Sequence, residues 1–415
     1  MIPTINPLRR FPAYMIFLCF LIPACLGLLS ACQGTPDNKN FISTDSIVIN
    51  LPDPQPLVEH EAKRLHTACQ TWYDSILEKS GFNGGIVVAK NGNIVFEKYR
   101  GMGHLDRQDT ITATTPFHIA SVSKTITAMA VLKLWQDKKL NIDDEFSKYY
   151  PAFNYPGVTI RSLLNHRSGL PNYTHFMEEL IADKKVYLHN QDVLDFLINR
   201  KAELKNIGTP NARFAYCNTN YALLALLIEK ISGISYPEYI AKNFFRPLQM
   251  DHSFVFVHAD SARVIPSYDW RGGFIPINFL DLVYGDKNIF STAEDMLKWD
   301  RLLRSGIMFK PETLEAAYTP YSNEKPGIRN YGLGWRMNIY PDGSKVIYHN
   351  GWWHGYNASF IRLINENATI IIMGNKFTKA IYKGKYLLSI FGNTYLPVEE
   401  EEGQSAKLPD SVMPK

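Results

Sequence analysis

An α+β fold is predicted, with one antiparallel sheet built from both ends of the chain and a mostly helical subdomain inserted between them. Strand patterns gather near the two ends. An early hairpin, Gly85–Ala89 and Ile94–Tyr99, flanks Asn91-Gly92, a strong tight-turn signal. Three β-rich runs follow late in the sequence, at 345–349, 358–363 and 369–373. We expect the active site in the cleft between the sheet and the helical subdomain.

Helical patterns occupy the middle of the chain and border both sheet segments. Apolar residues recur at helical spacing, and caps or helix stops mark several of the ends. The expected helices are 57–79, 121–135, 159–167, 220–232, 236–245, 293–305 and 382–390. The last of these could pack on the sheet.

The composition is that of an ordinary globular protein. Of the 415 residues, 46% are hydrophobic and 20% are charged, which excludes a largely disordered chain. The formal charge is +4, and about +2 remains without Arg9 and Arg10. With no basic stripe that interleaves aromatic residues, we expect no nucleic-acid partner.

The first residues have the pattern of an export signal. Arg9 and Arg10 precede an uncharged run, Ala13–Ser30, and Leu29-Ser30-Ala31-Cys32 resembles the bacterial lipobox. Segment 1–31 is therefore expected to be a lipoprotein signal peptide, with Cys32 lipidated and the protein anchored to the bacterial cell envelope. An uncleaved transmembrane anchor is the alternative. Polar residues 32–56 are expected to form a linker, 57–393 the catalytic domain and 394–415 a flexible tail.

Only two cysteines lie outside the signal segment and the lipobox. Cys69 and Cys217 could form a disulfide in an exported protein, but the sequence leaves open whether they meet.

Ser121-Val122-Ser123-Lys124 opens one of the predicted helices. A spacing of three places Ser121 and Lys124 about one turn apart on one helical face. Serine needs an adjacent base to act as a nucleophile, and a helix N-terminus adds free N–H groups. Taken alone, the tetrapeptide could equally be a helix start with a capping serine.

Tyr216-Cys217-Asn218 precedes an apolar helix. In extended backbone the side chains of Tyr216 and Asn218 point the same way, and a tyrosine beside a cation such as Lys124 is a plausible acid or base. A helix cap formed by Asn218 or Asn220 is the plainer interpretation.

His349-Asn350-Gly351 ends a predicted strand, before Trp352. Glycine permits close approach of a substrate, and the Trp352 N–H could join that of Ser121 in holding an oxyanion. A hairpin turn with a surface histidine is the alternative. His60-Glu61 lacks the second histidine of a zinc motif, so no metal or other cofactor is expected.

Together and in this order, the three motifs resemble those of the serine β-lactamases and penicillin-binding proteins. The likeness is greatest to the branch of class C β-lactamases and D-alanyl-D-alanine carboxypeptidases, and it covers roughly 57–391. Four further runs resemble that branch, at 117–120, 160–171, 288–295 and 331–335. The resemblance implies that Ser121 is acylated, that Lys124 assists its deprotonation and that Tyr216 relays protons. It also implies that Asn218 binds the substrate amide and that His349, Asn350, Gly351 and Trp352 border the substrate.

The third motif departs from the family pattern. His349 stands where many members have lysine, and Asn350 replaces a hydroxyl residue. Both family groups help to bind a substrate carboxylate, so efficient β-lactam hydrolysis is less expected here. The sequence therefore predicts a serine hydrolase that acts on a small peptide, an ester or a β-lactam-like compound. The alternatives are a penicillin-binding or sensing protein that is acylated without turnover, and an inert surface scaffold.

Overall fold

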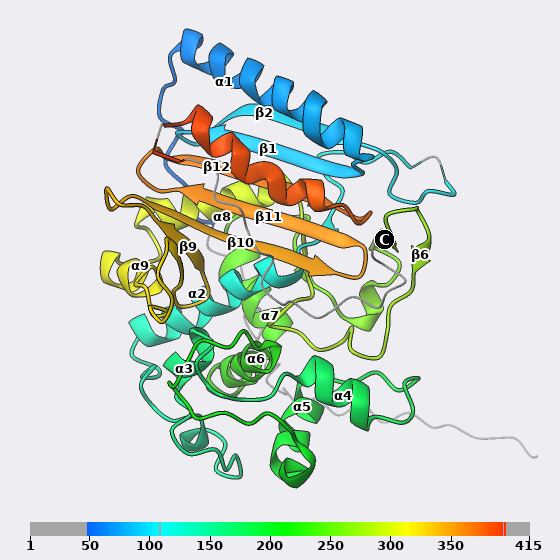
Figure 1. Ribbon diagram of the computed structural model, residues 1–415, viewed down its shortest axis with the longest axis vertical. Coiled ribbons are helices and arrows are strands. Elements are labelled where there is room, and N and C mark those ends of the chain that lie inside the picture. The colour runs from blue at the N-terminus through cyan, green and yellow to red at the C-terminus, as the bar shows by residue number, and fades with distance from the viewer. Residues whose placement is uncertain (1–47, 108, 393, 396–415) are drawn as a thin grey trace, which may run out of the picture. The chain divides into compact units, whose positions relative to one another are not determined.

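The computed structural model describes residues 48–107, 109–392 and 394–395, which belong to one compact unit beginning at Ser46. Its main feature is a seven-stranded antiparallel sheet with the order β2-β1-β12-β11-β10-β9-β8 (Figure 1). The strands are β1 (Gly84–Lys90), β2 (Asn93–Arg100), β8 (Arg329–Tyr331), β9 (Arg336–Ile339), β10 (Lys345–Trp353), β11 (Tyr356–Leu363) and β12 (Ala368–Gly374).

The two ends of the described chain meet inside this sheet, as the sequence predicts. Strand β1 pairs along its whole length with β12, from Gly84 opposite Gly374 to Lys90 opposite Ala368. The β1–β2 hairpin turns at Asn91 and Gly92, whose φ angles of 56° and 80° are those that its two-residue turn requires. The α+β fold class is thereby confirmed.

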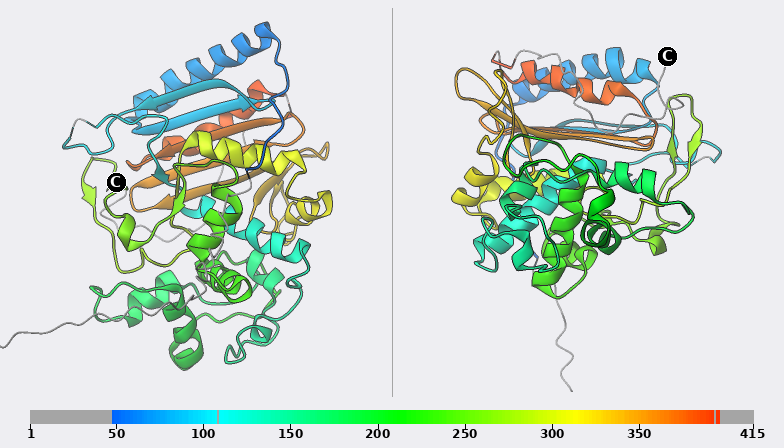
Figure 2. Two further views of the ribbon diagram at one scale, coloured as in Figure 1. Left: turned by 180° about the vertical axis from the view of Figure 1, so that it is seen from behind. Right: turned by 60° about the horizontal axis from the view of Figure 1, so that its bottom comes forward.

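Each face of the sheet is covered, which is why β1 and β12 are apolar throughout. On one face lie α1 (Glu59–Trp72) and the 3₁₀ helix η8 (Lys379–Ile390), which form one apolar cluster with alternate sheet residues such as Ile86 and Ile372 (Figures 1 and 2). The other face packs against α8 (Ala293–Ser305) and the helical region as part of a second, larger cluster.

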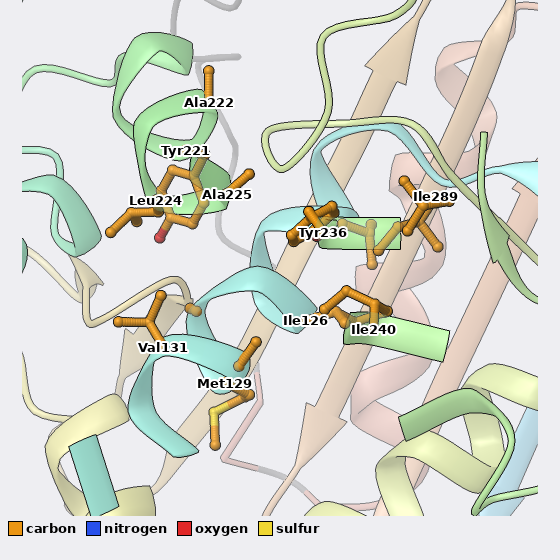
Figure 3. Packing of buried hydrophobic residues seen from close by; sticks show 14 of the residues in the cluster. Ile126, Met129, Val131, Tyr221, Ala222, Leu224, Ala225, Tyr236, Ile240 and Ile289 are labelled. Carbon is orange, nitrogen blue, oxygen red and sulfur yellow. The ribbon is translucent and has the colours of Figure 1, made fainter. Parts of the chain in front are cut away.

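The helical region is organised around α2 (Ser123–Gln136), which is buried on nearly all sides and correspondingly apolar. Figure 3 shows Ile126, Met129 and Val131 of this helix among side chains from neighbouring elements. The other α-helices are α3 (Ile160–Leu164), α4 (Tyr173–Leu180), α5 (Asn190–Asn199), α6 (Asn218–Ser232), α7 (Tyr236–Ile240) and α9 (Pro311–Ala317).

Short elements connect these layers. The π-helices are η1 (Tyr73–Leu77) and η6 (Ala241–Phe245), and the remaining 3₁₀ helices are η2 (Glu78–Ser80), η3 (Ala120–Val122), η4 (Phe146–Lys148), η5 (Lys201–Glu203) and η7 (His258–Asp260). A three-stranded sheet has the order β3 (Phe117–His118), β7 (Ile289–Ser291), β4 (Phe254–Val255), and a two-stranded one pairs β5 (Ser267–Tyr268) with β6 (Phe274–Ile275).

Several predicted boundaries are wrong. The α-helix expected at 121 begins at Ser123. Ser121 lies in the preceding 3₁₀ helix η3 (Ala120–Val122), in which Ala120 has a φ of +48°. The helix expected over 159–167 is only Ile160–Leu164, since His166 also has a positive φ. The helix after Tyr216 starts at Asn218, two residues earlier than predicted.

Three predicted features lie outside the described residues: the signal peptide at 1–31, the lipidation site Cys32 and most of the tail. The described part of the predicted linker is attached to the domain, because the N–H groups of Ile49 and Gln55 donate to the carbonyls of Pro247 and Asn91. Cys69 and Cys217 are buried as free thiols. Within the described part of the chain no helix is long and apolar enough to cross a membrane.

Candidate active site

The nucleophile candidate lies in a tight turn between β3 and α2. Ala120 takes a left-handed conformation, the N–H of Val122 donates to the Ile119 carbonyl, and α2 starts immediately afterwards. Ser121 is partly exposed, whereas the helix behind it is buried. The turn thus presents one hydroxyl at the N-terminal end of an immobile helix, where backbone N–H groups favour developing negative charge.

Lys124 is the second residue of α2, is fully buried and contacts the serine directly. Its Nζ lies 3.0 Å from Ser121 Oγ and donates to the Asp286 carbonyl at 2.8 Å. The same Nζ is 5.0 Å from the centroid of the Tyr216 ring. The predicted hydroxyl, amine and tyrosine therefore converge, although Tyr216 is 92 positions from Lys124 in the sequence.

Tyr216 packs against His166, a residue of the 160–171 run to which the sequence analysis assigned no catalytic role. The ring of His166 lies 4.4 Å from that of Tyr216, centroid to centroid, and His166 Nδ1 accepts the N–H of Cys217. Asn218 follows as the first residue of α6. Its buried Oδ1 accepts no hydrogen bond from the residues that the structure describes, which leaves it available to a substrate N–H. Asn220, the alternative cap residue, is the third residue of α6, and its Oδ1 accepts a hydrogen bond from the Ser168 hydroxyl.

His349 is buried at the inner face of β10 and belongs to a chain of three side chains. Because His166 Nδ1 accepts from backbone, its Nε2–H donates to the Tyr331 hydroxyl at 3.1 Å, and Tyr331 in turn donates to His349 Nε2 at 3.3 Å. His349 Nδ1–H then donates to the Asn350 carbonyl at 2.7 Å. Burial, followed by the charges of Arg336 and Lys124, holds the pKa of His349 well below its usual range. The ring is neutral and its one N–H is bound to backbone, so it offers a substrate carboxylate no hydrogen-bond donor.

The other members of the third motif play different parts. Side chains alternate along a strand, so Asn350 points to the opposite face from His349, where its Oδ1 accepts from Ser359. The assignment of Asn350 to substrate binding stays a prediction, and its Oδ1 is already paired with Ser359. Trp352 is partly exposed, and its Nε1 donates to the His354 carbonyl.

Gly351 allows the backbone of residues 119–121, the turn that carries Ser121, to approach β10 closely. A Cβ on Gly351 would lie 2.3 Å from the Ile119 carbonyl oxygen and 3.1 Å from Ser121 N. The glycine thus sets the distance between β10 and Ser121.

Gly351→Ala is expected to destabilise the protein by about 2–3 kcal/mol, because backbone atoms must move to admit the methyl group. It should also lower activity, since the displaced atoms include those around Ser121. Urea unfolding and turnover check both effects. Gly208→Ala is the control, because its Cβ would meet no atom closer than 3.5 Å. Equal stability of the two variants would contradict this account of Gly351.

Arg336 is the charged residue at the site that the motifs did not indicate. Its guanidinium carbon lies 5.2 Å from the Tyr216 ring centroid and 5.9 Å from that of Tyr331. Strand β9 places it there, opposite Tyr348 of β10. Sequence offered one signal, since Arg336 directly follows the 331–335 run. Within the described residues no group of three or more potential metal ligands occurs.

Fold and site together define a serine hydrolase-type protein. A family model described as Beta-lactamase matches residues 70–387. Penicillin-binding protein 4* of Bacillus subtilis (strain 168) is 30% identical over 371 residues, covering 85% of this chain and 81% of that protein. Putative penicillin-binding protein PbpX of the same strain is 26% identical over 334 residues, covering 77% and 80%. The chain belongs to the Beta-lactamase family and is homologous to penicillin-binding proteins.

A solved structure gives the same result for the fold. The crystal structure of a penicillin binding protein from Bacillus halodurans superposes with a TM-score of 0.67 at 24% identity, covering 78% of this chain and 98% of that one. At this identity the likeness concerns the fold alone.

Proposed function

We propose that the protein hydrolyses an amide or ester substrate through an acyl-Ser121 intermediate, in the manner of the class C β-lactamase and D-alanyl-D-alanine carboxypeptidase branch. The contact that carries the proposal is the 3.0 Å approach of Lys124 Nζ to Ser121 Oγ, with the Tyr216 ring beside it. A serine hydroxyl in contact with a buried amine is the arrangement that activated nucleophiles use.

Each residue then has a defined task. Ser121 Oγ attacks the substrate carbonyl, and its proton passes to the coupled pair of Lys124 and Tyr216. Tyr216 delivers the proton to the leaving group and afterwards activates the hydrolytic water. Asn218 orients the substrate amide through its free Oδ1. The N–H groups of Ser121 and Trp352 hold the oxyanion.

The substrate we propose carries a carboxylate, as small peptides and β-lactam-like compounds do. Family members commonly bind that group with the lysine of the third motif, but here His349 is neutral and bound to backbone. Arg336 supplies positive charge at the same place, next to Tyr216 and Tyr331. A guanidinium is well suited to this task, because it binds carboxylates in a bidentate fork.

Arg336→Gln is expected to raise KM for a carboxylate-bearing substrate roughly 10- to 100-fold, since a charge-assisted hydrogen bond is worth about 1.5–3 kcal/mol. A neutral p-nitrophenyl ester should be affected by less than about threefold, well below the loss of such a bond. Steady-state kinetics on both substrates measure the split, with Arg329→Gln on neighbouring β8 as the control. Equal losses on both substrates would remove the carboxylate-binding role.

Time-resolved intact-mass measurement tests the proposed function as a whole. A D-alanyl peptide, nitrocefin or an ester should add an acyl mass on Ser121 that disappears as product forms, and Ser121→Ala should show neither. An adduct that persists would instead favour the penicillin-binding or sensing alternative. Turnover in Ser121→Ala would overturn the assignment of the nucleophile.

We also propose that the protein is an exported lipoprotein anchored through Cys32 in the bacterial cell envelope. The support is the positive, apolar and lipobox pattern of the first 32 residues. Metabolic labelling with an alkyne fatty acid should modify the wild-type protein and not Cys32→Ser. Equal labelling of both would exclude this anchor.

A further inference from the structure

We propose that His118 is a positioning residue, which holds Ala120 in its left-handed conformation and so orients Ser121 and its N–H for catalysis. The proposal rests on the function proposed above and adds a residue to it. Ala120 N–H donates to His118 Nδ1 at 3.0 Å, two residues upstream in the same turn. No motif used for the catalytic assignment includes this side chain.

The ring of His118 is fixed on every side. It is only 3% exposed, it stacks on Tyr356 with 5.3 Å between centroids, and it makes an edge-to-face contact with Phe290 with 5.0 Å between centroids. Its Nε2 lies 3.0 Å from Asn288 Oδ1. A ring held in this way places its Nδ1 acceptor at one position, and with it the N–H of Ala120.

The tautomer follows from these partners. Nδ1 accepts a backbone N–H and therefore carries no proton, so Nε2–H donates to Asn288 Oδ1. The ring has to be neutral for this arrangement, and burial lowers the pKa of His118 to about 4. Asn288 is itself fixed, because its Nδ2 donates to the carbonyls of Asp281 and Val283.

Ala120 needs such a support. Its φ of +48° is a conformation that residues with a Cβ rarely adopt, and Ala120 lies directly before Ser121. Glycine would adopt it without strain, but the chain has alanine here. Strain of this kind persists at active sites only where neighbouring groups hold it.

One segment of the chain joins this support to the catalytic amine. Asp286 accepts from Lys124 Nζ through its carbonyl, and Asn288, two residues on, binds His118. The next residue, Ile289, accepts the N–H of Ile119 at 2.9 Å. Segment 286–289 therefore holds the amine on one side and the nucleophile turn on the other.

Two substitutions of His118 distinguish a role in positioning Ala120 from a role in packing alone. His118→Asn keeps an acceptor at the δ position for Ala120 N–H, whereas His118→Gln reaches Asn288 and loses that acceptor. Asparagine is the smaller side chain, so a role in packing alone predicts that His118→Asn is the worse variant. A positioning role predicts the reverse.

The measurement is the rate of Ser121 labelling by a fluorophosphonate, together with kcat and KM for an ester. We expect His118→Gln to lower the labelling rate and kcat roughly 10- to 100-fold with KM nearly unchanged, since misplaced oxyanion donors act on the transition state. His118→Asn should stay within about threefold of wild type, because it keeps that acceptor. Thermal unfolding of both variants shows whether either has lost its fold.

The outcomes are distinct. If His118→Gln reacts as fast as His118→Asn while both remain folded, the positioning role is overturned and the serine mechanism stands. If the wild-type protein shows no labelling that depends on Ser121, the proposed function fails and this inference fails with it.

Discussion

Lys124→Met should lower kcat/KM by roughly 10⁴-fold or more, the scale seen when one member of a catalytic serine site is removed. At about 1.4 kcal/mol per factor of ten, this loss exceeds 5 kcal/mol of transition-state stabilisation. The reason is local: the Nζ is the group that contacts Ser121 Oγ, and methionine fills the buried space without an amine. Ester turnover and fluorophosphonate labelling rates measure the effect.

Lys133→Met on the same helix is the matched control. Lys133 is partly exposed and paired with Asp137 one turn away, far from Ser121 in the helix. We expect its turnover to equal that of the wild-type protein. If Lys124→Met retained more than about a hundredth of the wild-type kcat/KM, an effect of a different order from that of a catalytic group, Lys124 would be structural only.

Asp300→Asn is expected to cost about 3–5 kcal/mol of the free energy of unfolding, the range found when one partner of a buried ion pair is removed. Asp300 of α8 is 2% exposed and pairs with Arg304 and Arg362. Thr369 of β12 also donates to it. This cluster fastens α8 to β11 and β12, and the variant leaves Arg362 buried without its countercharge.

Urea unfolding at several pH values measures this contribution. Burial alone would raise the pKa of Asp300, but the charges of Arg304 and Arg362 outweigh burial and lower it. A depressed pKa in the folded state gives stability that is complete above about pH 4, the unfolded value, and is lost as pH falls further. Wild type should therefore lose more stability below pH 4 than Asp300→Asn does.

Asp137→Asn serves as the surface control, because exposed pairs contribute at most about 1 kcal/mol. A loss for Asp300→Asn as small as that of this control would show that the buried cluster does not stabilise the attachment of α8.

The sheet was predictable because its signals are local. Alternating or continuous apolar runs and the Asn91-Gly92 turn mark β1, β2, β10, β11 and β12 with no knowledge of their partners, whereas β8 and β9 were not predicted. The sequence predicted that strands from both ends share one sheet, but not that β1 pairs with β12. The start of α2 was not predictable, because residue propensities indicate neither the positive φ of Ala120 nor the 3₁₀ helix that precedes α2.

The residues of the candidate site also differ in whether the sequence alone could predict them. Ser121 and Lys124 were found because they stand in one tetrapeptide, and Tyr216 because it stands in a short motif. Arg336 and His166 were missed because their contacts with Tyr216 join residues far apart in sequence. His118 was missed because the sequence gives no signal of the positive φ at its partner Ala120. The motif alone could not show that Asn350 lies on the opposite side of the strand from His349, where it contacts Ser359.

The pairing of β1 with β12 also determines when, during synthesis, the exposed edge of β1 can be paired. An N-terminal fragment that stops before Ala368 leaves a full edge of β1 unpaired, and such an edge readily pairs with other chains. Translation has to pass Gly374 before the edge is closed, so a nascent chain of more than 350 residues still exposes it. Premature termination late in the message should therefore yield aggregating rather than partly active polypeptides.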